Sequence, residues 1–248
     1  FDLQMARDQI ALTFGKKAQS IIDSNVVLLD AGYSWAEANL DFRYSIPATP
    51  ATQPQIATNG NTALALKTMT DELERQGIET ETIQIGQQSM HGCIACGHCG
   101  KSEGNRCVFA DDGVNEISQK MRDADGFILG CPTYYAAIPG TMKSFLDRVF
   151  FSSSRYFRLK VATSCAVVRR AGGVDVVHQL NNYLNLAQTV IPPSQYWTIA
   201  YGMNKGEVEG DGEGMQTLVK NAASMAWLLK LIEAGKDTIP RPENEKRI

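Results

Sequence analysis

Apolar and polar residues follow two different periods along this chain from about residue 60 onward. Apolar positions three or four residues apart predict helices, and short apolar runs between turn residues predict strands. The predicted helices include residues 66–73, 114–121, 142–149, 177–184 and 218–232. The predicted strands are residues 26–29, 78–85, 126–130, 161–168 and 195–200. Strands that alternate with helices indicate an α/β fold: a three-layer sandwich in which a five-stranded parallel sheet has helices on both faces.

The length of 248 residues suits one main domain with additions at its ends. We expect the α/β domain to occupy residues 58–234 and a short tail to occupy residues 235–248. The preceding residues 1–57 form an atypical segment, which begins with a helical pattern at residues 3–22 and includes the predicted first strand.

Charge and hydropathy exclude several kinds of partner. The formal net charge is -3 and no basic run is present, which argues against nucleic acid or an anionic membrane as the main partner. No apolar stretch approaches the length of a membrane span, and residues 1–8 lack the basic-then-apolar order of a signal peptide. We therefore expect a cytoplasmic protein. Its thiols would stay reduced, so its six cysteines do not indicate a disulfide framework.

Four of the six cysteines are close together in the sequence, at Cys93, Cys96, Cys99 and Cys107. A C-x2-C-x2-C run followed by a fourth cysteine is typical of iron-sulfur cluster ligation, because thiolates three positions apart converge on one centre. A zinc site with four cysteine ligands and a set of unligated thiols remain as alternatives. The other two cysteines, Cys131 and Cys165, lie among apolar residues and are predicted to belong to the core.

Three loops at the ends of predicted strands or starts of helices are candidate cofactor-binding sites. The first combines a glycine with amide and hydroxyl side chains just before a helix, so its backbone N–H groups suit a phosphate. A plain helix N-cap explains the same residues. This loop consists of Asn59, Gly60, Asn61 and Thr62.

The second loop presents two aromatic rings beside backbone amides, an arrangement that suits a flat heterocycle but also occurs as ordinary packing. It consists of Pro132, Thr133, Tyr134, Tyr135 and Ala136. The third loop carries two cations on a glycine-containing backbone, which suits a ring edge or a phosphate, although a solvated basic turn has the same composition. It consists of Arg169, Arg170, Ala171, Gly172 and Gly173.

Together these loops resemble the flavodoxin-like NAD(P)H-dependent FMN reductase family, and the cysteine motif is similar to that of its iron-sulfur flavoprotein branch. The resemblance covers about residues 58–234. It rests on the following segments: Gly60-Asn61-Thr62, Gly92-Cys93-Ile94-Ala95-Cys96-Gly97-His98-Cys99, Asp111-Asp112-Gly113, Pro132-Thr133-Tyr134-Tyr135, Pro139-Gly140-Thr141-Met142-Lys143, Phe145-Leu146-Asp147-Arg148 and Arg169-Arg170-Ala171-Gly172-Gly173.

The resemblance implies a flavodoxin-like fold that binds FMN. Asn61 and Thr62 would hold the phosphate, residues 132–136 would line the flavin ring and residues 170–173 would close it. The four clustered cysteines match the positions that hold a 4Fe-4S cluster in the iron-sulfur branch. NAD(P)H or a reduced ferredoxin-like carrier would donate electrons, and a flavin, a quinone or a similar small molecule would accept them. Because flavin sites in this family commonly lie near subunit interfaces, a homodimer or homotetramer is expected.

The N-terminal region departs from the family pattern. Family members usually run from a first apolar strand into Gly-Ser-Pro-Arg, which joins the phosphate site, and this element is missing here. Either an insertion follows the strand at residues 26–29, or another segment such as residues 42–46 supplies the first strand. A weakened phosphate site leaves a second hypothesis open: a non-catalytic flavin- or zinc-binding module that acts through protein contacts. No residue is an obvious general acid or base, so no catalytic residue is assigned.

Overall fold

The computed structural model describes residues 3–15, 17–39 and 60–243, and the chain divides into two compact units, residues 1–55 and 56–248. The first unit contains helix α1 (Leu3–Phe14) and helix α2 (Gln19–Asn39). An ion pair joins them, in which Arg7 Nε donates to Asp30 Oδ1 at 2.9 Å. Neither helix has a buried residue among those described, so this pair of helices encloses no core of its own.

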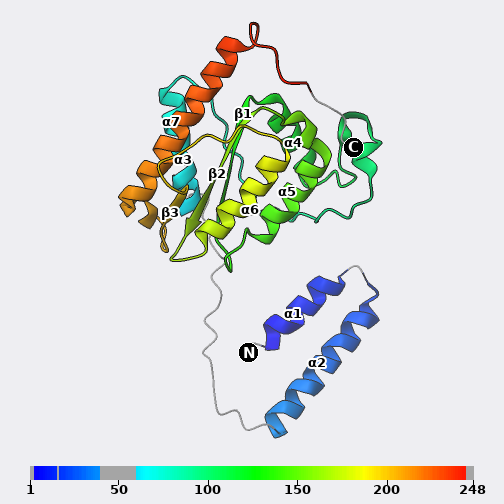
Figure 1. Cartoon of the computed structure of the whole chain (residues 1–248). Coiled ribbons are helices and arrows are strands. Elements are labelled where there is room, and N and C mark those ends of the chain that lie inside the picture. The colour runs from blue at the N-terminus through cyan, green and yellow to red at the C-terminus, as the bar shows by residue number, and fades with distance from the viewer. Residues whose placement is uncertain (1–2, 16, 40–59, 244–248) are drawn as a thin grey trace. The chain divides into compact units, whose positions relative to one another are not determined.

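The second unit is built on a parallel sheet in the order β1-β2-β3. Strand β1 (Gly126–Pro132) pairs with β2 (Val161–Val168), which pairs in turn with β3 (Ile199–Tyr201). Every residue of β2 is buried, which agrees with its uninterrupted run of apolar and small residues. Because all three strands run in the same direction, their carboxyl ends meet at one edge of the sheet (Figure 1).

Helices cover both faces of this sheet (Figure 1). Helices α3 (Asn61–Arg75) and α7 (Gly212–Gly235) pack against one face, on which Cys165 and Val167 of β2 lie. Helices α4 (Val114–Asp123), α5 (Gly140–Ser153) and α6 (Gly173–Leu186) contribute to the core on the other face, with Ala166 and Val168. This alternation along β2 places one core on each side of the sheet and confirms the three-layer α/β architecture.

Short 3₁₀ turns complete the unit. They are η1 (His98–Gly100), η2 (Glu103–Asn105), η3 (Ser154–Tyr156) and η4 (Glu207–Gly210).

The prediction of five strands was wrong for the described residues, which form three. Residues 26–29, predicted as the first strand, lie within helix α2. A run of only four apolar residues does not distinguish a strand from a helix by its periodicity, and the helical continuation on both sides decides the outcome. The alternative first strand, residues 42–46, lies outside the described residues. The last strand is also shorter than predicted, because β3 begins at Ile199 rather than at residue 195.

Residues 78–85 were predicted as a strand and form no strand in the structure. A strand needs a neighbour to pair with its backbone N–H and C=O groups. A cavity of about 510 Å³ lies beside this segment, and its lining includes Ile78, Ile83 and Ile85 together with residues 126–130 of β1. Residues 78–85 therefore carry the alternating pattern and share a cavity with the edge strand β1, but they form no ladder with it.

Candidate functional site

The carboxyl edge of the sheet brings two of the candidate loops, residues 132–136 and 169–173, beside the loop that follows β3. The loop after β1 is tied to β2, since Thr133 N donates to Val167 O at 2.9 Å. The loop after β3 is tied to the same strand, since Gly202 N donates to Val168 O at 3.0 Å. The loop at residues 169–173 follows β2 directly. Three loops that are far apart in the sequence thus leave the sheet side by side, as ligand-binding loops do in doubly wound folds.

Helix α3 begins at this edge with an uncapped N-terminus. Its N-cap is Gly60, and no side chain in the described part of the chain caps its first N–H groups. Unpaired N–H groups at a helix N-terminus are a site for phosphate. The side chain of Asn61 is used otherwise: it donates to Asn204 O at 2.8 Å and accepts from Gly206 N at 2.8 Å. Asn61 therefore fixes the helix start beside the turn after β3, a contact that sequence reasoning missed. Asn59 lies outside the described residues.

The second loop folds into a tight hairpin. Tyr134 and Ala137 exchange backbone hydrogen bonds of 3.0 Å each way. The two residues between them, Tyr135 and Ala136, both have left-handed backbone conformations, with φ of 51° and 58°. Such conformations are costly for residues other than glycine and often mark functional turns. The turn projects both tyrosines from the surface, and Tyr135 is fully exposed.

The third loop packs directly on the second. Gly172 has φ of +86°, and a Cβ added to it would lie 2.9 Å from both Cα and Cβ of Ala136. Only glycine allows this approach. Arg169 and Arg170 precede it with exposed side chains. Beside this contact, Thr133 Oγ1 is buried without a hydrogen-bond partner among the described residues. A buried hydroxyl without a partner is unusual in proteins, and such an atom is suited to bond with a ligand.

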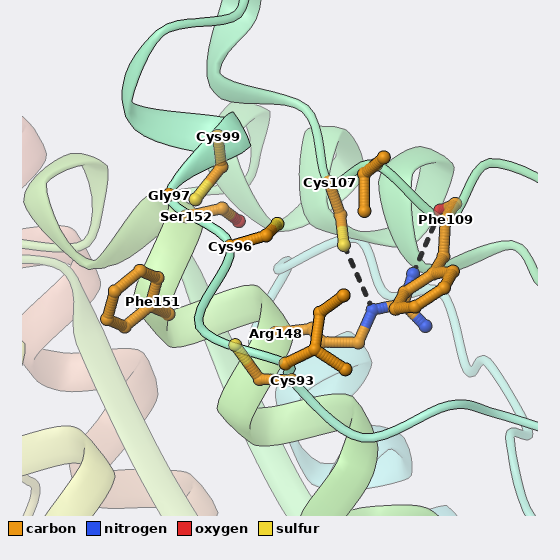
Figure 2. Close-up of a pocket in the computed structure, with 11 residues that line it drawn as sticks. Cys93, Cys96, Gly97, Cys99, Cys107, Phe109, Arg148, Phe151 and Ser152 are labelled. Atoms are coloured by element: carbon orange, nitrogen blue, oxygen red, sulfur yellow. Dashed lines mark hydrogen bonds between the residues drawn. The ribbon is translucent and has the colours of Figure 1, made fainter.

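The four clustered cysteines line one small hollow, together with residues of α5 (Figure 2). Left-handed conformations at Ala95 and Gly97 turn the chain between the first three cysteines. Cys93 and Cys96 are exposed, whereas Cys99 and Cys107 are half-buried. The hollow has a volume of about 20 Å³, and no group of three or more His, Cys, Asp or Glu in the described part of the chain lies close enough together to hold a single metal ion.

Side chains from α4 hold the cysteine loop in place. Asn115 accepts from Cys107 N at 2.7 Å and donates to Cys107 O at 3.0 Å, so both backbone groups of this cysteine are fixed. Arg122 donates to Gly104 O and Asn105 O in the segment between the last two cysteines. The loop lacks regular secondary structure apart from two 3₁₀ turns, and these side-chain bonds replace a backbone ladder.

Arg148 of α5 has a completely buried side chain that reaches this hollow (Figure 2). Its Nε donates to Cys107 Sγ at 3.2 Å, and its Nη2 donates to Phe109 O at 2.9 Å. Asp112 forms an ion pair with the same guanidinium. Burial acts to raise the pKa of Asp112, but the hydrogen bonds and charge of Arg148 outweigh it and lower that pKa below its ordinary value. Sequence reasoning quoted Asp112 and Arg148 as family motif residues but did not predict the ion pair between them.

Burial raises the pKa of the Cys99 thiol, and the neighbouring Cys107 raises it further. The other three thiols all contribute to this rise in pKa, because all four lie close enough together to interact electrostatically. Cys131 and Cys165 are different. Both are buried in the core, as predicted, and burial raises the pKa of each to about 12.

The sheet order, the helices on both faces and the loops at the carboxyl edge define a flavodoxin-like α/β protein. The structure is similar to RosB, solved with bound 8-demethyl-8-formylriboflavin-5'-phosphate. The TM-score is 0.57 at 16% sequence identity, and the match covers 78% of this chain and 87% of RosB. At this identity the likeness shows the fold.

Sequence comparison identifies the family. The model of the NADPH-dependent FMN reductase family matches residues 55–204, and the chain belongs to this family. It is 31% identical over 187 residues to an iron-sulfur flavoprotein of Methanocaldococcus jannaschii, a match that covers 70% of this chain and 93% of that protein. It is 29% identical over 169 residues to an iron-sulfur flavoprotein of Methanosarcina thermophila, with 66% and 85% covered. None of the described helices is long and apolar enough to cross a membrane.

Proposed function

We propose that this protein is an FMN-dependent oxidoreductase. It takes electrons from NAD(P)H or a reduced ferredoxin-like carrier and passes them to a flavin, a quinone or a similar small acceptor, through a 4Fe-4S cluster held by the four clustered cysteines. The observation that carries the flavin part is the contact between the second and third loops at the sheet edge, beside Thr133 Oγ1, which is buried and has no hydrogen-bond partner among the described residues. Membership of the FMN reductase family supports the same reading.

Each loop has a role in this proposal. The uncapped N–H groups of α3 and the hydroxyl of Thr62 hold the flavin phosphate. Residues 132–136 line the ring, and Thr133 Oγ1 gains a hydrogen-bond partner there. The exposed cations of Arg169 and Arg170 approach the ring edge or the phosphate, while residues 171–173 close the site with backbone.

The donor set at the cysteine hollow fits an iron-sulfur cluster. Four thiols line one space that also has apolar walls and a buried N–H donor, which are features that such clusters use. The enclosed volume is about that of one water molecule, so the loop with the two exposed thiols has to move outward to admit a cluster. Its lack of regular structure makes that movement inexpensive.

One helix connects the two sites. Helix α5 begins at Gly140, shortly after the hairpin at residues 134–137, and its residues 148, 151 and 152 line the cysteine hollow. FMN exchanges electrons in pairs or singly, and an iron-sulfur cluster carries single electrons. The chain's own residues bind and orient these groups, and a rigid helix between them fixes their separation.

The test is an anaerobic absorption spectrum of the purified protein with iron and acid-labile sulfide analysis. Flavin bands with about four irons per chain support the proposal. Flavin without iron leaves an FMN reductase with unligated thiols. Zinc without iron or flavin supports the alternative of a non-catalytic module. Anaerobic oxidation of NADH and of NADPH then identifies the donor, and light scattering tests the proposed homodimer or homotetramer, which a mass equal to one chain contradicts.

A further inference from the structure

The Arg148 guanidinium makes a contact that its structural role does not require. Its charge is paired with that of Asp112, and its Nη2 donates to Phe109 O. The single hydrogen of Nε points instead at Cys107 Sγ, 3.2 Å away. Cys107 does not need this bond to be held in place, because Asn115 fixes its backbone N–H and C=O. The bond to sulfur is therefore available for a task other than holding the loop.

We propose that Arg148 is a positioning residue that raises the reduction potential of the cluster by donating a hydrogen bond to the Cys107 thiolate. This inference rests on the proposed function, because it requires a cluster on the four cysteines. Adding one electron to a cluster increases the negative charge on its thiolate ligands. A donor aimed at one of these sulfurs stabilises the reduced form more than the oxidised form and so raises the potential.

The surroundings of Arg148 strengthen this effect. Its side chain has no exposed surface, so water and salt screen the guanidinium poorly. Its guanidinium lies over the ring of Phe109, with the guanidinium carbon 5.2 Å from the ring centroid. Asp112 offsets part of the positive charge, but the direction of the Nε–H bond toward sulfur is unaffected by this partner.

Arg122 provides a matched control on the same loop. Like Arg148, Arg122 donates to backbone carbonyls of the loop, here those of Gly104 and Asn105. Its side chain is partly buried, whereas that of Arg148 is fully buried. Its guanidinium also lies 4.5 Å from the Tyr156 ring centroid. None of its described hydrogen bonds goes to a cysteine. Loss of Arg122 therefore loosens the loop without removing a donor from sulfur.

The experiment measures iron content and the cluster's midpoint potential in the purified holoprotein, by anaerobic titration with dithionite, for wild type, R148K, R148M, R122K and R122M. At the wild-type midpoint, R148M should lower the ratio of reduced to oxidised cluster about tenfold, which corresponds to about 59 mV for one electron. R148K should give a smaller decrease in the same direction. The Arg122 variants should change iron content or stability and leave the midpoint unchanged.

A further variant gives a shift of opposite sign. D112N keeps the shape of the partner and an acceptor oxygen but removes its negative charge, so Arg148 is less neutralised and the midpoint should rise. If R148M holds no iron, the opposite shifts of R148K and D112N carry the test. Equal midpoints in wild type, R148K and D112N overturn this inference and leave the proposed function standing. Absence of iron and sulfide from the wild-type protein overturns the cluster and this inference together.

Discussion

The cysteine hollow and the carboxyl edge of the sheet belong to the same unit but are positioned in different ways. At the sheet edge, strand register and backbone hydrogen bonds place the loops, and Gly172 allows two of them to touch. None of the residues that line the hollow belongs to a described strand. Side chains from α4 and α5 hold the loop instead: Asn115 bonds to the backbone of Cys107, and Arg148 bonds to the backbone oxygen of Phe109.

This difference predicts which substitutions will separate the two proposed cofactors, FMN and the iron-sulfur cluster. A site held by a few side chains should lose its metal when one of them is removed, while the sheet edge and its flavin stay intact. A site held by backbone should respond to an added Cβ where two chains touch, while the cysteine loop keeps its metal. The predictions below measure how independent the two sites are.

The largest effect is expected for Asp112→Ala. Removing the partner of a fully buried arginine leaves an uncompensated charge in the interior, which destabilises a protein by about 3–5 kcal/mol. Denaturant unfolding measures this loss, and metal analysis should show reduced iron at an unchanged ratio of flavin to protein. Loss of flavin in parallel with iron would show that the two sites are not independent.

The ion pair between Asp112 and Arg148 should also affect how the stability of the wild-type protein depends on pH. The pKa of Asp112 is lower in the folded protein than in the unfolded chain, because Arg148 outweighs the effect of burial. Its contribution to stability is therefore complete above the unfolded pKa, about 3.9, and is lost as the pH falls through the lower folded value. Asp112→Ala should lack this part of the acid dependence. Parallel stability profiles below pH 4 for the two proteins would contradict the assignment.

The next effect is expected for Gly172→Ala at the sheet edge. The alanine would have to adopt a φ of +86°, and its Cβ would lie 2.9 Å from Ala136. Backbone strain and overpacking together should destabilise the protein by about 2–4 kcal/mol. Binding of FMN should weaken by roughly tenfold, or about 1.4 kcal/mol, as the hairpin is displaced. Titration with FMN measures this loss of affinity. The iron content should be unchanged.

Gly77→Ala is the matched control for this substitution. Gly77 has a similar φ of +80°, but nothing lies within 4 Å of its added Cβ. It should lose only about 1–2 kcal/mol from the left-handed backbone and bind FMN normally. Equal flavin affinity in the two variants would mean that contact between the second and third loops does not shape the site.

The same contrast explains what could be predicted from the sequence. The helices of the second unit and strands β1 and β2 could be predicted from local periodicity. Each of them buries a continuous set of apolar residues that is visible in its own sequence. Residues 78–85 carry a strand pattern too. That pattern becomes a strand only beside a partner, and a partner is a property of the whole sheet rather than of the segment.

The candidate sites divide in the same way. Glycines, cysteines and turn residues predicted the positions of the loops, because tight turns and metal ligation require these residue types. The residues that hold the loops were not recognised, because an asparagine or arginine has many uses. Asn61 was assigned to a phosphate and binds the turn at residues 204–206. Asn115 was not singled out at all, although it fixes Cys107 from a different element.

A smaller effect tests the buried hydroxyl at the sheet edge. Thr133→Val removes a polar atom that has no partner among the described residues, so the flavin-free protein should be unchanged or more stable by about 1 kcal/mol. Binding of FMN should weaken by about 0.5–1.5 kcal/mol if the hydroxyl bonds to the cofactor. Thermal unfolding with and without FMN measures both the stability of the flavin-free protein and its affinity for FMN. An affinity equal to that of wild type would exclude this contact.

Thr163→Val supplies the comparison for a buried hydroxyl that has a partner. Thr163 Oγ1 donates to Asn221 Oδ1 at 2.8 Å, and both residues are buried. Removing this donor leaves the amide oxygen unsatisfied and should destabilise the protein by about 1–3 kcal/mol with or without FMN. In the flavin-free protein, the same substitution should therefore destabilise the fold at Thr163 and not at Thr133.

The smallest effect concerns thiol reactivity, which separates the six cysteines into two groups. The thiolate is the reactive form, and the pKa of about 12 for Cys131 and Cys165 leaves almost none of it at pH 8. Native metal-free protein should therefore be alkylated at four cysteines, with exposed Cys93 and Cys96 first and Cys99 later, because burial raises its pKa. After iron and sulfide are restored, all four should be protected, and mass spectrometry of peptides counts them. Continued labelling of Cys93 in iron-loaded protein would show that this cysteine is not a ligand.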